Sequence, residues 1–180
     1  TPVEIRANPK VFLGYSDTTV AHLACFSAGL CTFYGPAIMA GFAENPGMFP
    51  YMVEAVRRTM FTAEPPGLVV PNHDGWTFEQ LDWTDPADQG RRRPLQPSTP
   101  WRFISGSSPA TGHLIGGCLE VLAWLRGTPV WPVSEAFDNA ILFIETSEEG
   151  EPPAFVGREL RTLAAMGIMQ RLSGLIVGRP

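Results

Sequence analysis

The sequence lacks the features on which membrane, secreted and metal-binding proteins depend. No stretch reaches the ~18 apolar residues of a membrane span, and the chain opens Thr-Pro-Val-Glu, without the basic start and apolar run of a signal peptide. The three cysteines, Cys25, Cys31 and Cys118, are odd in number and have no metal-ligand spacing. Because Cys25 and Cys31 lie in apolar runs, we expect buried free thiols in a cytoplasmic protein, with no metal and no cofactor.

Charged residues are also scarce. They make up 17% of the chain against 44% hydrophobic residues, and the net charge of −5 gives no reason to expect a nucleic acid or an anionic membrane as partner. A chain of 180 residues is long enough to bury a core, and its length fits one large domain or two small ones. We therefore expect a globular, rather apolar protein.

What the sequence does contain is a candidate nucleophile turn at Gly14–Thr18. The apolar run 11–13 precedes it and a helix-like run at 19–26 follows, which predicts strand, sharp turn and helix. Such a turn lifts a serine hydroxyl above the sheet, and the helix N-terminus offers N–H groups to an oxyanion. Thr18 stands where the G-x-S-x-G pattern has its second glycine, so the pattern alone leaves open that Ser16 simply caps the helix.

Apolar runs alternate with helical patterns along most of the chain, which predicts an α/β fold with a parallel-sheet N-terminal domain and a smaller α/β C-terminal domain. An elbow normally follows strands that are already laid down, so its place near residue 16 indicates a partial N-terminal domain. The apolar strand 174–177 runs straight into the last residues, which indicates a partial C-terminal domain, and we expect the chain to be an internal fragment. Residues 1–9 are expected to be a polar lead-in, and 106–117 a Gly- and Ser-rich segment. The predicted strands are 10–14, 30–34, 140–145 and 174–177, and the predicted helices 17–28, 50–61, 119–125 and 153–165.

The segment 71–103, which contains Trp76, Trp83 and Trp101, is expected to be an active-site loop between the domains at 1–70 and 104–180. Such aromatic content argues against disorder, because tryptophan buries well. For Trp83 the alternative stays open that it anchors a core. For the arginine run 91–93 two interpretations stay open: a solvated face, or a group that attracts a phosphate or carboxylate.

Glu145 is the candidate acid, because it ends the apolar strand 140–145. The alternative is a surface carboxylate in an acidic cluster with Glu148 and Glu149. Gly116 and Gly117, with Gly112 before them, indicate close approach of the backbone to another strand or to a ligand.

A serine nucleophile also needs a base, and only three histidines exist. His22 lies six residues after Ser16 on the same helix, which at ~100° per residue places it on another side, so we interpret it as a packed helix histidine. His73 lies in the loop and His113 in a glycine-rich segment. Either could approach Ser16 in principle, so both stay open as a base from the residues alone.

Several blocks, in order, resemble the LD-carboxypeptidase family of serine peptidases, and the long Trp-rich segment resembles its microcin C immunity branch. The blocks are Asn8–Thr19, Thr32–Pro36, Gly116–Leu119, Gly127–Pro129, Ile141–Glu145 and Ser173–Pro180. The resemblance implies that Ser16 is the nucleophile, that Glu145 is the acid, and that the backbone N–H of Asp17 is an oxyanion donor. It also implies a homodimer and a catalytic histidine from a segment after Pro180. The family usually has Asn where Cys118 stands, which puts one polar contact in doubt.

The resemblance implies hydrolysis of an amide in a peptidyl or aminoacyl nucleotide, with Trp83 stacked on the base and Trp76 as the second choice. Gly116 and Gly117 would line the same substrate site. One alternative is a muropeptide L,D-carboxypeptidase of cell-wall recycling. An alternative of another class is a catalytically silent, truncated binding module, because the chain lacks the family's histidine.

Overall fold

The computed structural model describes residues 1–106 and 109–178, which form two compact units. Residues 1–35 and the described part of 107–180 make the first, here called the sheet unit. Residues 36–106 make the second, here called the loop unit. The predicted boundaries at 70 and 103 refer to the domains of a longer protein, and they stay a prediction.

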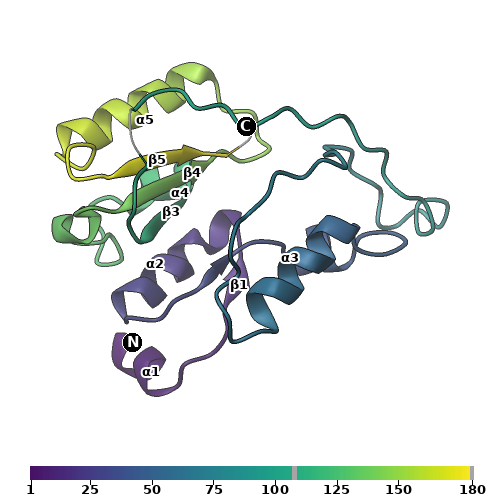
Figure 1. Ribbon diagram of the computed structural model, residues 1–180, viewed down its shortest axis with the longest axis horizontal. Coiled ribbons are helices and arrows are strands. Elements are labelled where there is room, and N and C mark those ends of the chain that lie inside the picture. The colour runs from purple at the N-terminus through teal and green to yellow at the C-terminus, as the bar shows by residue number, and fades with distance from the viewer. Residues whose placement is uncertain (107–108, 179–180) are drawn as a thin grey trace. The chain divides into compact units, whose positions relative to one another are not determined.

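The sheet unit alternates short strands with helices, which confirms the α/β class (Figure 1). Both of its sheets are parallel: β1 pairs with β2, and the other sheet has the order β3-β4-β5. The elements are α1 (Pro2–Ala7), β1 (Leu13–Gly14), η1 (Ser16–Thr18), α2 (Thr19–Ser27), β2 (Phe33–Tyr34), β3 (Leu114–Cys118), α4 (Leu119–Leu125), η3 (Ser134–Phe137), β4 (Ile141–Glu145), α5 (Pro153–Ala165) and β5 (Gly174–Val177).

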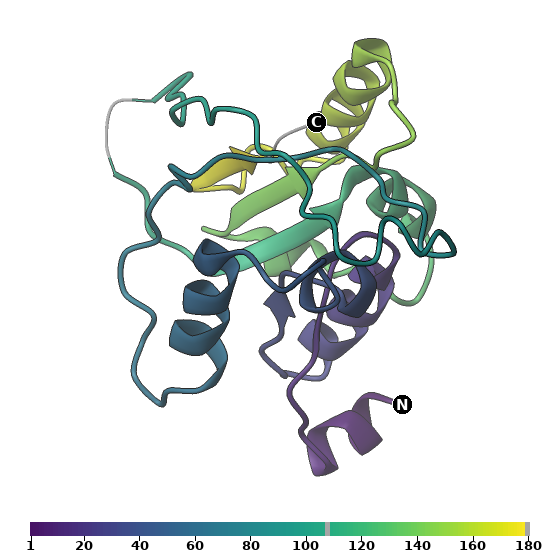
Figure 2. The same cartoon turned by 90° about the vertical axis from the view of Figure 1, so that its right-hand side faces the viewer.

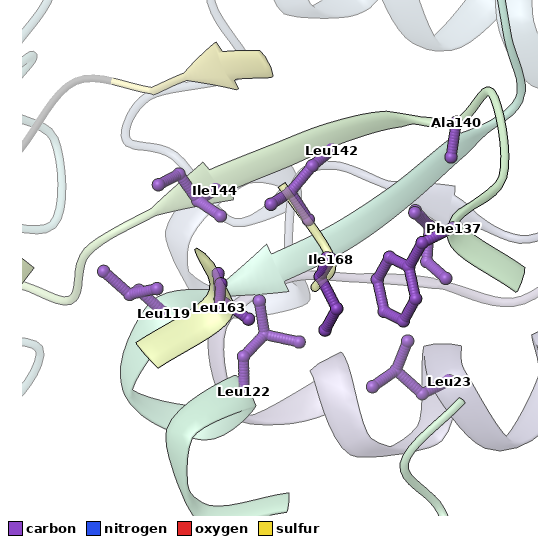
Figure 3. Close-up of a cluster of buried hydrophobic side chains, with 10 residues drawn as sticks. Leu23, Leu119, Leu122, Phe137, Ala140, Leu142, Ile144, Leu163 and Ile168 are labelled. Carbon is purple, nitrogen blue, oxygen red and sulfur yellow. The ribbon is translucent and has the colours of Figure 1, made fainter. Parts of the chain in front are cut away.

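One apolar cluster forms the core of the sheet unit (Figure 3). Strand β4 contributes Leu142 and Ile144 to it, each 2% exposed, because alternate residues of a strand face the same side. The other members come from α2, β3, α4, η3 and α5 and from the loops beside them: Leu23, Ile115, Leu119, Leu122, Phe137, Ala140, Leu163 and Ile168. Burying one such leucine or isoleucine contributes about 1.5–3 kcal/mol.

The sequence predicted most elements of the sheet unit, but it missed β3, α1 and the short helix η3. Strand β3 passes so close to its neighbours that a Cβ at Gly116 would lie 1.8 Å from the Phe143 carbonyl oxygen. A Cβ at Gly117 would lie 2.4 Å from Thr19 Oγ1. Gly116 therefore reflects the predicted close approach to another strand, whereas Gly117 makes room for the Thr19 side chain of α2. Helix α1 begins with a capping box between Thr1 and Glu4.

The loop unit contains little regular structure (Figure 2). A short π-helix, η2 (Ile38–Phe42), precedes α3 (Pro50–Met60), which begins at a proline as predicted. From residue 61 to 106, one isolated antiparallel bridge joins Trp76 to Gln96. The buried positions of this unit are two glycines and one carboxylate, Gly41, Gly75 and Glu44.

The cysteines differ in part from the expectation. All three thiols are free, and Cys25 and Cys118 are buried, but Cys31 is exposed because it lies in the loop before β2 and not in an apolar element.

In the described ranges, no three His, Cys, Asp or Glu side chains are grouped as a metal site would require. None of the helices in those ranges combines the length and hydropathy of a membrane span.

Candidate active site

The predicted turn between strand and helix is present at Ser16. Strand β1 ends at Gly14, η1 begins at Ser16, and the Ser16 backbone has φ 58°, a left-handed conformation that is uncommon for a residue with a side chain. The strain is of the kind that functional turns retain. Thr18 and not Ser16 is the N-cap of α2, and its side chain makes no capping hydrogen bond, so the capping alternative is wrong.

The residue that fills the second glycine position, Thr18, is accommodated by the turn. Its hydroxyl donates to the Tyr15 carbonyl at 2.9 Å. A Cβ at Gly14 would lie 2.7 Å from Thr18 Oγ1, so the glycine at position 14 leaves room for the threonine side chain. The turn thus needs its first glycine and replaces the second with a hydrogen-bonded threonine.

The structure brings Ser16 and Glu145 together through a third residue, Tyr34. The backbone N–H of Ser16 donates to Tyr34 Oη at 2.9 Å, and Tyr34 Oη donates to Glu145 Oε1 at 2.5 Å. Tyr34 ends β2 and Glu145 ends β4, so both side chains lie at the carboxyl ends of parallel strands. Sequence reasoning missed Tyr34, because its position at the end of the predicted strand 30–34 carried no signal of its pairing with Gly14, which only the fold shows.

The Glu145 side chain is half-buried and bonded to Tyr34, although it also lies near the acidic side chains of Glu120 and Glu148. Burial raises the pKa of its carboxyl above the ordinary value, and the charges of Glu120 and Glu148 add to the rise. The hydrogen bond from Tyr34 opposes the rise, because it favours the ionised carboxylate. A carboxylate with an anchored oxygen at a strand end can orient a cationic partner.

A second set of contacts holds the end of β3 against the turn and fixes the loop after Glu145. The Cys118 N–H donates to Thr19 Oγ1 at 3.0 Å, which ties β3 to the start of α2. The Ser147 N–H and hydroxyl both donate to Glu120 Oε1 at 2.9 Å. Burial works to raise the pKa of Glu120, but the hydrogen bonds from Ser147 and nearby groups outweigh it, so its pKa is lowered.

Cys118, the residue that departs from the family pattern, is a buried donor. Its thiol donates to Glu120 Oε2 at 3.3 Å. Burial raises the pKa of the Cys118 thiol to about 12, so it stays protonated near neutral pH. It is therefore a packing residue with a weak hydrogen bond and no nucleophile.

Two histidines of the sheet unit are engaged away from Ser16. His22 is buried, with Nδ1 2.7 Å from Thr32 Oγ1 and Nε2 3.0 Å from the Gly14 carbonyl oxygen, as expected for a packed histidine. His113 Nε2 lies 2.8 Å from the Ala136 carbonyl oxygen, and its ring stacks on Phe26. In residues 1–106 and 109–178, no histidine forms a hydrogen bond with the Ser16 hydroxyl.

Asp17 and the two glycines of β3 complete the predicted positions in the sheet unit. Asp17 is exposed in the first turn of η1, where a helical N–H has no carbonyl before it to bind. Gly117 and Cys118 pair with Ile144 and Glu145, so the end of β3 lies beside the predicted acid. The roles of Asp17, Gly116 and Gly117 toward a substrate stay predictions.

In the loop unit, the tryptophans differ in their surroundings. Trp83 is 63% exposed, so within this chain it is not the buried anchor of a core. Trp76 is partly buried: its indole N–H donates to the Pro97 carbonyl at 3.2 Å and its ring lies 5.7 Å from that of Phe78. Trp83 thus presents a free aromatic surface, whereas Trp76 has a packing role in the loop.

The arginine run is held by partners inside the loop unit. Arg91 forms ion pairs with Glu79 at 2.7 Å and with Asp88 at 2.9 Å, and Arg92 lies 5.0 Å from the centre of the Phe49 ring. Arg93 binds the buried carboxylate of Glu44. Arg91 and Arg92 stay exposed, so the solvated alternative fits these two residues, whereas Arg93 is partly buried and fastens the loop to itself.

Comparison with known proteins places both ends of the chain in one family. Residues 2–35 match the LD-carboxypeptidase N-terminal domain, and residues 111–180 match the LD-carboxypeptidase C-terminal domain. A Vibrio cholerae protein named as a carboxypeptidase is 34% identical over 97% of this chain and 50% of its own length. The microcin C7 self-immunity protein MccF of Escherichia coli is 28% identical over 97% of this chain and 49% of its own. The chain spans about half the length of these relatives.

Solved structures agree with the sequence relatives. An MccF-like protein from Streptococcus pneumoniae in complex with AMP has a TM-score of 0.83 and 30% identity, over 95% of this chain and 53% of its own. MccF in complex with aspartyl sulfamoyl adenosine has a TM-score of 0.80 and 30% identity, over 99% and 52%. A muramoyltetrapeptide carboxypeptidase from Oxalobacter formigenes has a TM-score of 0.65 and 25% identity, over 99% and 49%. The two domain matches together span more than half of the sequence, and with these structures they show that the chain belongs to the LD-carboxypeptidase family.

Proposed function

We propose that the protein is a serine carboxypeptidase or amidase in which Ser16 is the nucleophile and Glu145 the acid of a Ser-Glu-His triad. The observation that carries this proposal is the strained φ of Ser16, directly after β1, in a turn linked through Tyr34 to Glu145. A serine in such a turn presents its hydroxyl at the end of the sheet. Membership of a carboxypeptidase family supports the same chemistry.

In the proposed reaction, Ser16 Oγ attacks the carbonyl carbon of the scissile amide while the histidine takes its proton. The Asp17 N–H donates to the oxyanion that forms, as the residue after the nucleophile does in other elbows. Glu145 orients the histidine and stabilises its cationic form. The histidine then protonates the leaving amine, and water releases the acyl group from Ser16.

We assign no base among the described histidines. His22 and His113 are engaged in the contacts given above, and the family resemblance implies a histidine from a later segment of the complete protein. The activity we propose is therefore that of the protein at its natural length. A catalytically silent binding module remains the alternative if no such histidine exists.

We infer that the substrate is an amide of a peptidyl or aminoacyl nucleotide. Similarity to proteins bound to AMP and to aspartyl sulfamoyl adenosine supports this class. So does the exposed ring of Trp83, since stacking a base on an aromatic face contributes about 1–3 kcal/mol. Trp76 is the weaker candidate, because its ring already packs against Phe78.

The second candidate is a muropeptide L,D-carboxypeptidase, which the similarity to the Oxalobacter formigenes enzyme favours. The substrate of such an enzyme carries no nucleobase that could stack on an aromatic ring, so Trp83 would have no role in substrate binding. From the resemblance we further propose that the protein is located in the cytoplasm, forms a homodimer and confers antibiotic immunity. Size-exclusion chromatography with light scattering tests the homodimer directly.

The decisive experiment incubates the protein at its natural length with an aminoacyl sulfamoyl adenosine and, separately, with a muropeptide tetrapeptide. We expect cleavage of the aminoacyl sulfamoyl adenosine, which mass spectrometry of the products detects. In Ser16→Ala the cleavage activity should fall by at least ~10³-fold. Trp83→Ala should lose ~10-fold or more, while the equally exposed Trp101→Ala serves as the matched control. Full activity of Ser16→Ala would refute the serine mechanism, and cleavage of the tetrapeptide alone would move the substrate to cell-wall peptides.

A further inference from the structure

The hydroxyl of Tyr34 is the meeting point of three elements. It lies 2.9 Å from the Ser16 backbone nitrogen at the start of η1 and 2.5 Å from Glu145 Oε1 at the end of β4. The Thr19 hydroxyl, at the start of α2, lies 3.4 Å away. The first two partners are 129 residues apart in the chain, from 16 to 145, so this contact forms only in the folded sheet unit.

The chemistry of the three groups fixes the direction of the hydrogen bonds. A backbone N–H can only donate, so Tyr34 Oη must accept from Ser16. The phenolic proton is then free for Glu145, and an ionised carboxylate can only accept. A separation of 2.5 Å is typical of a charge-assisted O–H···O⁻ bond. The two hydrogen bonds therefore form a chain in which the Ser16 N–H donates to Tyr34 Oη and Tyr34 Oη donates to Glu145.

The ring of Tyr34 is held independently of its hydroxyl. The Phe143 ring from β4 lies edge-on at 5.1 Å between centres, and the His22 ring from α2 lies at 5.2 Å. Removal of the oxygen atom alone leaves both aromatic contacts in place. The fold and the hydrogen bonds of Tyr34 can therefore be tested separately.

We propose that Tyr34 is a positioning residue. Its hydroxyl holds the nucleophile turn and the acid in a fixed relative position, and it leaves Glu145 Oε2 available to the histidine. This inference rests on the roles proposed for Ser16 and Glu145. Tyr34 acts through those groups and does not touch the reacting atoms. Its hydroxyl holds the Ser16 backbone in the strained turn and restricts the rotation of the Glu145 carboxylate.

The same contact predicts a pH effect with a definite sign. Burial raises the pKa of Glu145, and the Tyr34 hydrogen bond lowers it. Removal of the hydroxyl should therefore move the pKa of Glu145 upward. Tyr34 itself stays protonated, because burial and the contact with Glu145 raise its pKa above the ordinary value. Other charges that act on Glu145 are those of Glu120 and Glu148, which the substitution leaves unchanged.

The test compares Tyr34→Phe with Tyr51→Phe, a matched control that loses an exposed hydroxyl bonded to the Val70 carbonyl in the loop unit. For the protein at its natural length, we expect kcat of Tyr34→Phe to fall about 10- to 100-fold, as for loss of one hydrogen bond to a charged group. KM should stay within ~2-fold, because uniform substrate binding is unaffected. The acid limb of the kcat profile should move to higher pH. Tyr51→Phe should match the unmodified protein throughout.

A second readout needs no turnover. Carbon-13 NMR follows the titration of the Glu145 carboxyl, which Glu145→Gln assigns, and nitrogen-15 spectra follow the Ser16 amide. We expect Tyr34→Phe to raise the Glu145 pKa and to shift the Ser16 amide, with the core resonances unchanged. An unchanged titration and amide signal would overturn the proposal, even if kcat falls. If no substrate is cleaved by any variant, the proposed function fails, and the NMR titration still decides whether Tyr34 couples the two groups.

Discussion

In the sheet unit, ten buried apolar side chains form one cluster, whereas the buried positions of the loop unit are Gly41, Gly75 and Glu44. The loop unit instead depends on ion pairs, a cation–π contact and hydrogen-bonded turns. Many of its large apolar side chains are exposed, among them Phe61, Leu68, Trp83, Trp101 and Ile104. Apolar burial supplies most folding free energy, so the two units should differ sharply in stability.

This difference matches the roles that we propose. A nucleophile and an acid need fixed geometry, and both lie on the unit with the packed core. A segment that only contacts a substrate can tolerate motion, and low local stability is common in such segments. Exposed aromatic side chains in the loop unit are then available for contacts with a ligand.

The largest expected effect is the loss of a core side chain. Leu142, 2% exposed in β4, should destabilise the protein by about 2–5 kcal/mol when changed to Ala, because a cavity remains in a packed cluster. Leu68, 77% exposed in the loop unit, should cost less than ~0.5 kcal/mol in the same change. Urea unfolding followed by circular dichroism measures both. Equal effects would show that the contrast between the units is wrong.

An intermediate effect is expected from the ion pairs of the loop unit. Arg93→Gln leaves the buried Glu44 carboxylate without its partner, which should cost about 1–3 kcal/mol of local stability. Arg91→Gln removes a pair at an exposed site, where the expected cost is at most ~1 kcal/mol. Hydrogen exchange resolved by mass spectrometry should locate both effects in 36–106. Faster exchange in β4 after Arg93→Gln would contradict two separately stabilised units.

The smallest effect concerns acid. Burial lowers the pKa of His22, so the unfolded chain binds a proton more readily than the folded one. Stability of the sheet unit should therefore fall as the pH drops below about 6.5, the ordinary histidine value. His22→Gln should flatten this slope, whereas exposed His73→Gln should keep it. Urea midpoints measured from pH 7.5 to 5 compare the three, and a steeper slope in His22→Gln would contradict the prediction.

Several features follow from local sequence and were predicted correctly. Helices α4 and α5 and strand β5 begin and end at the predicted residues, because periodic apolar positions are bounded by glycine or proline. The turn at Ser16 also follows from its neighbours, an apolar run before it and a helical run after it. The family resemblance, likewise read from short blocks, agrees with the matched domains.

Other features depend on contacts between distant residues. Strand β3 was missed because a glycine-rich sequence resembles a loop. The reason for the glycine at position 116 is visible only in the fold, where a Cβ would collide with the Phe143 backbone of β4. The partner of Arg93 could not be found from local sequence, because Glu44 lies 49 residues away in the chain. No local pattern encodes such pairings.

The sequence by itself determined the α/β class, the position of the turn at Ser16 between strand and helix, and the carboxylate at the end of β4, because each depends on neighbouring residues. Only the tertiary structure decided that Tyr34 links the two, that Ser16 has φ 58°, and that Thr18 and not Ser16 caps α2. The physical reason is that parallel strands bring together the ends of segments separated by many residues, and hydrogen bonds across that edge have no signature in local sequence.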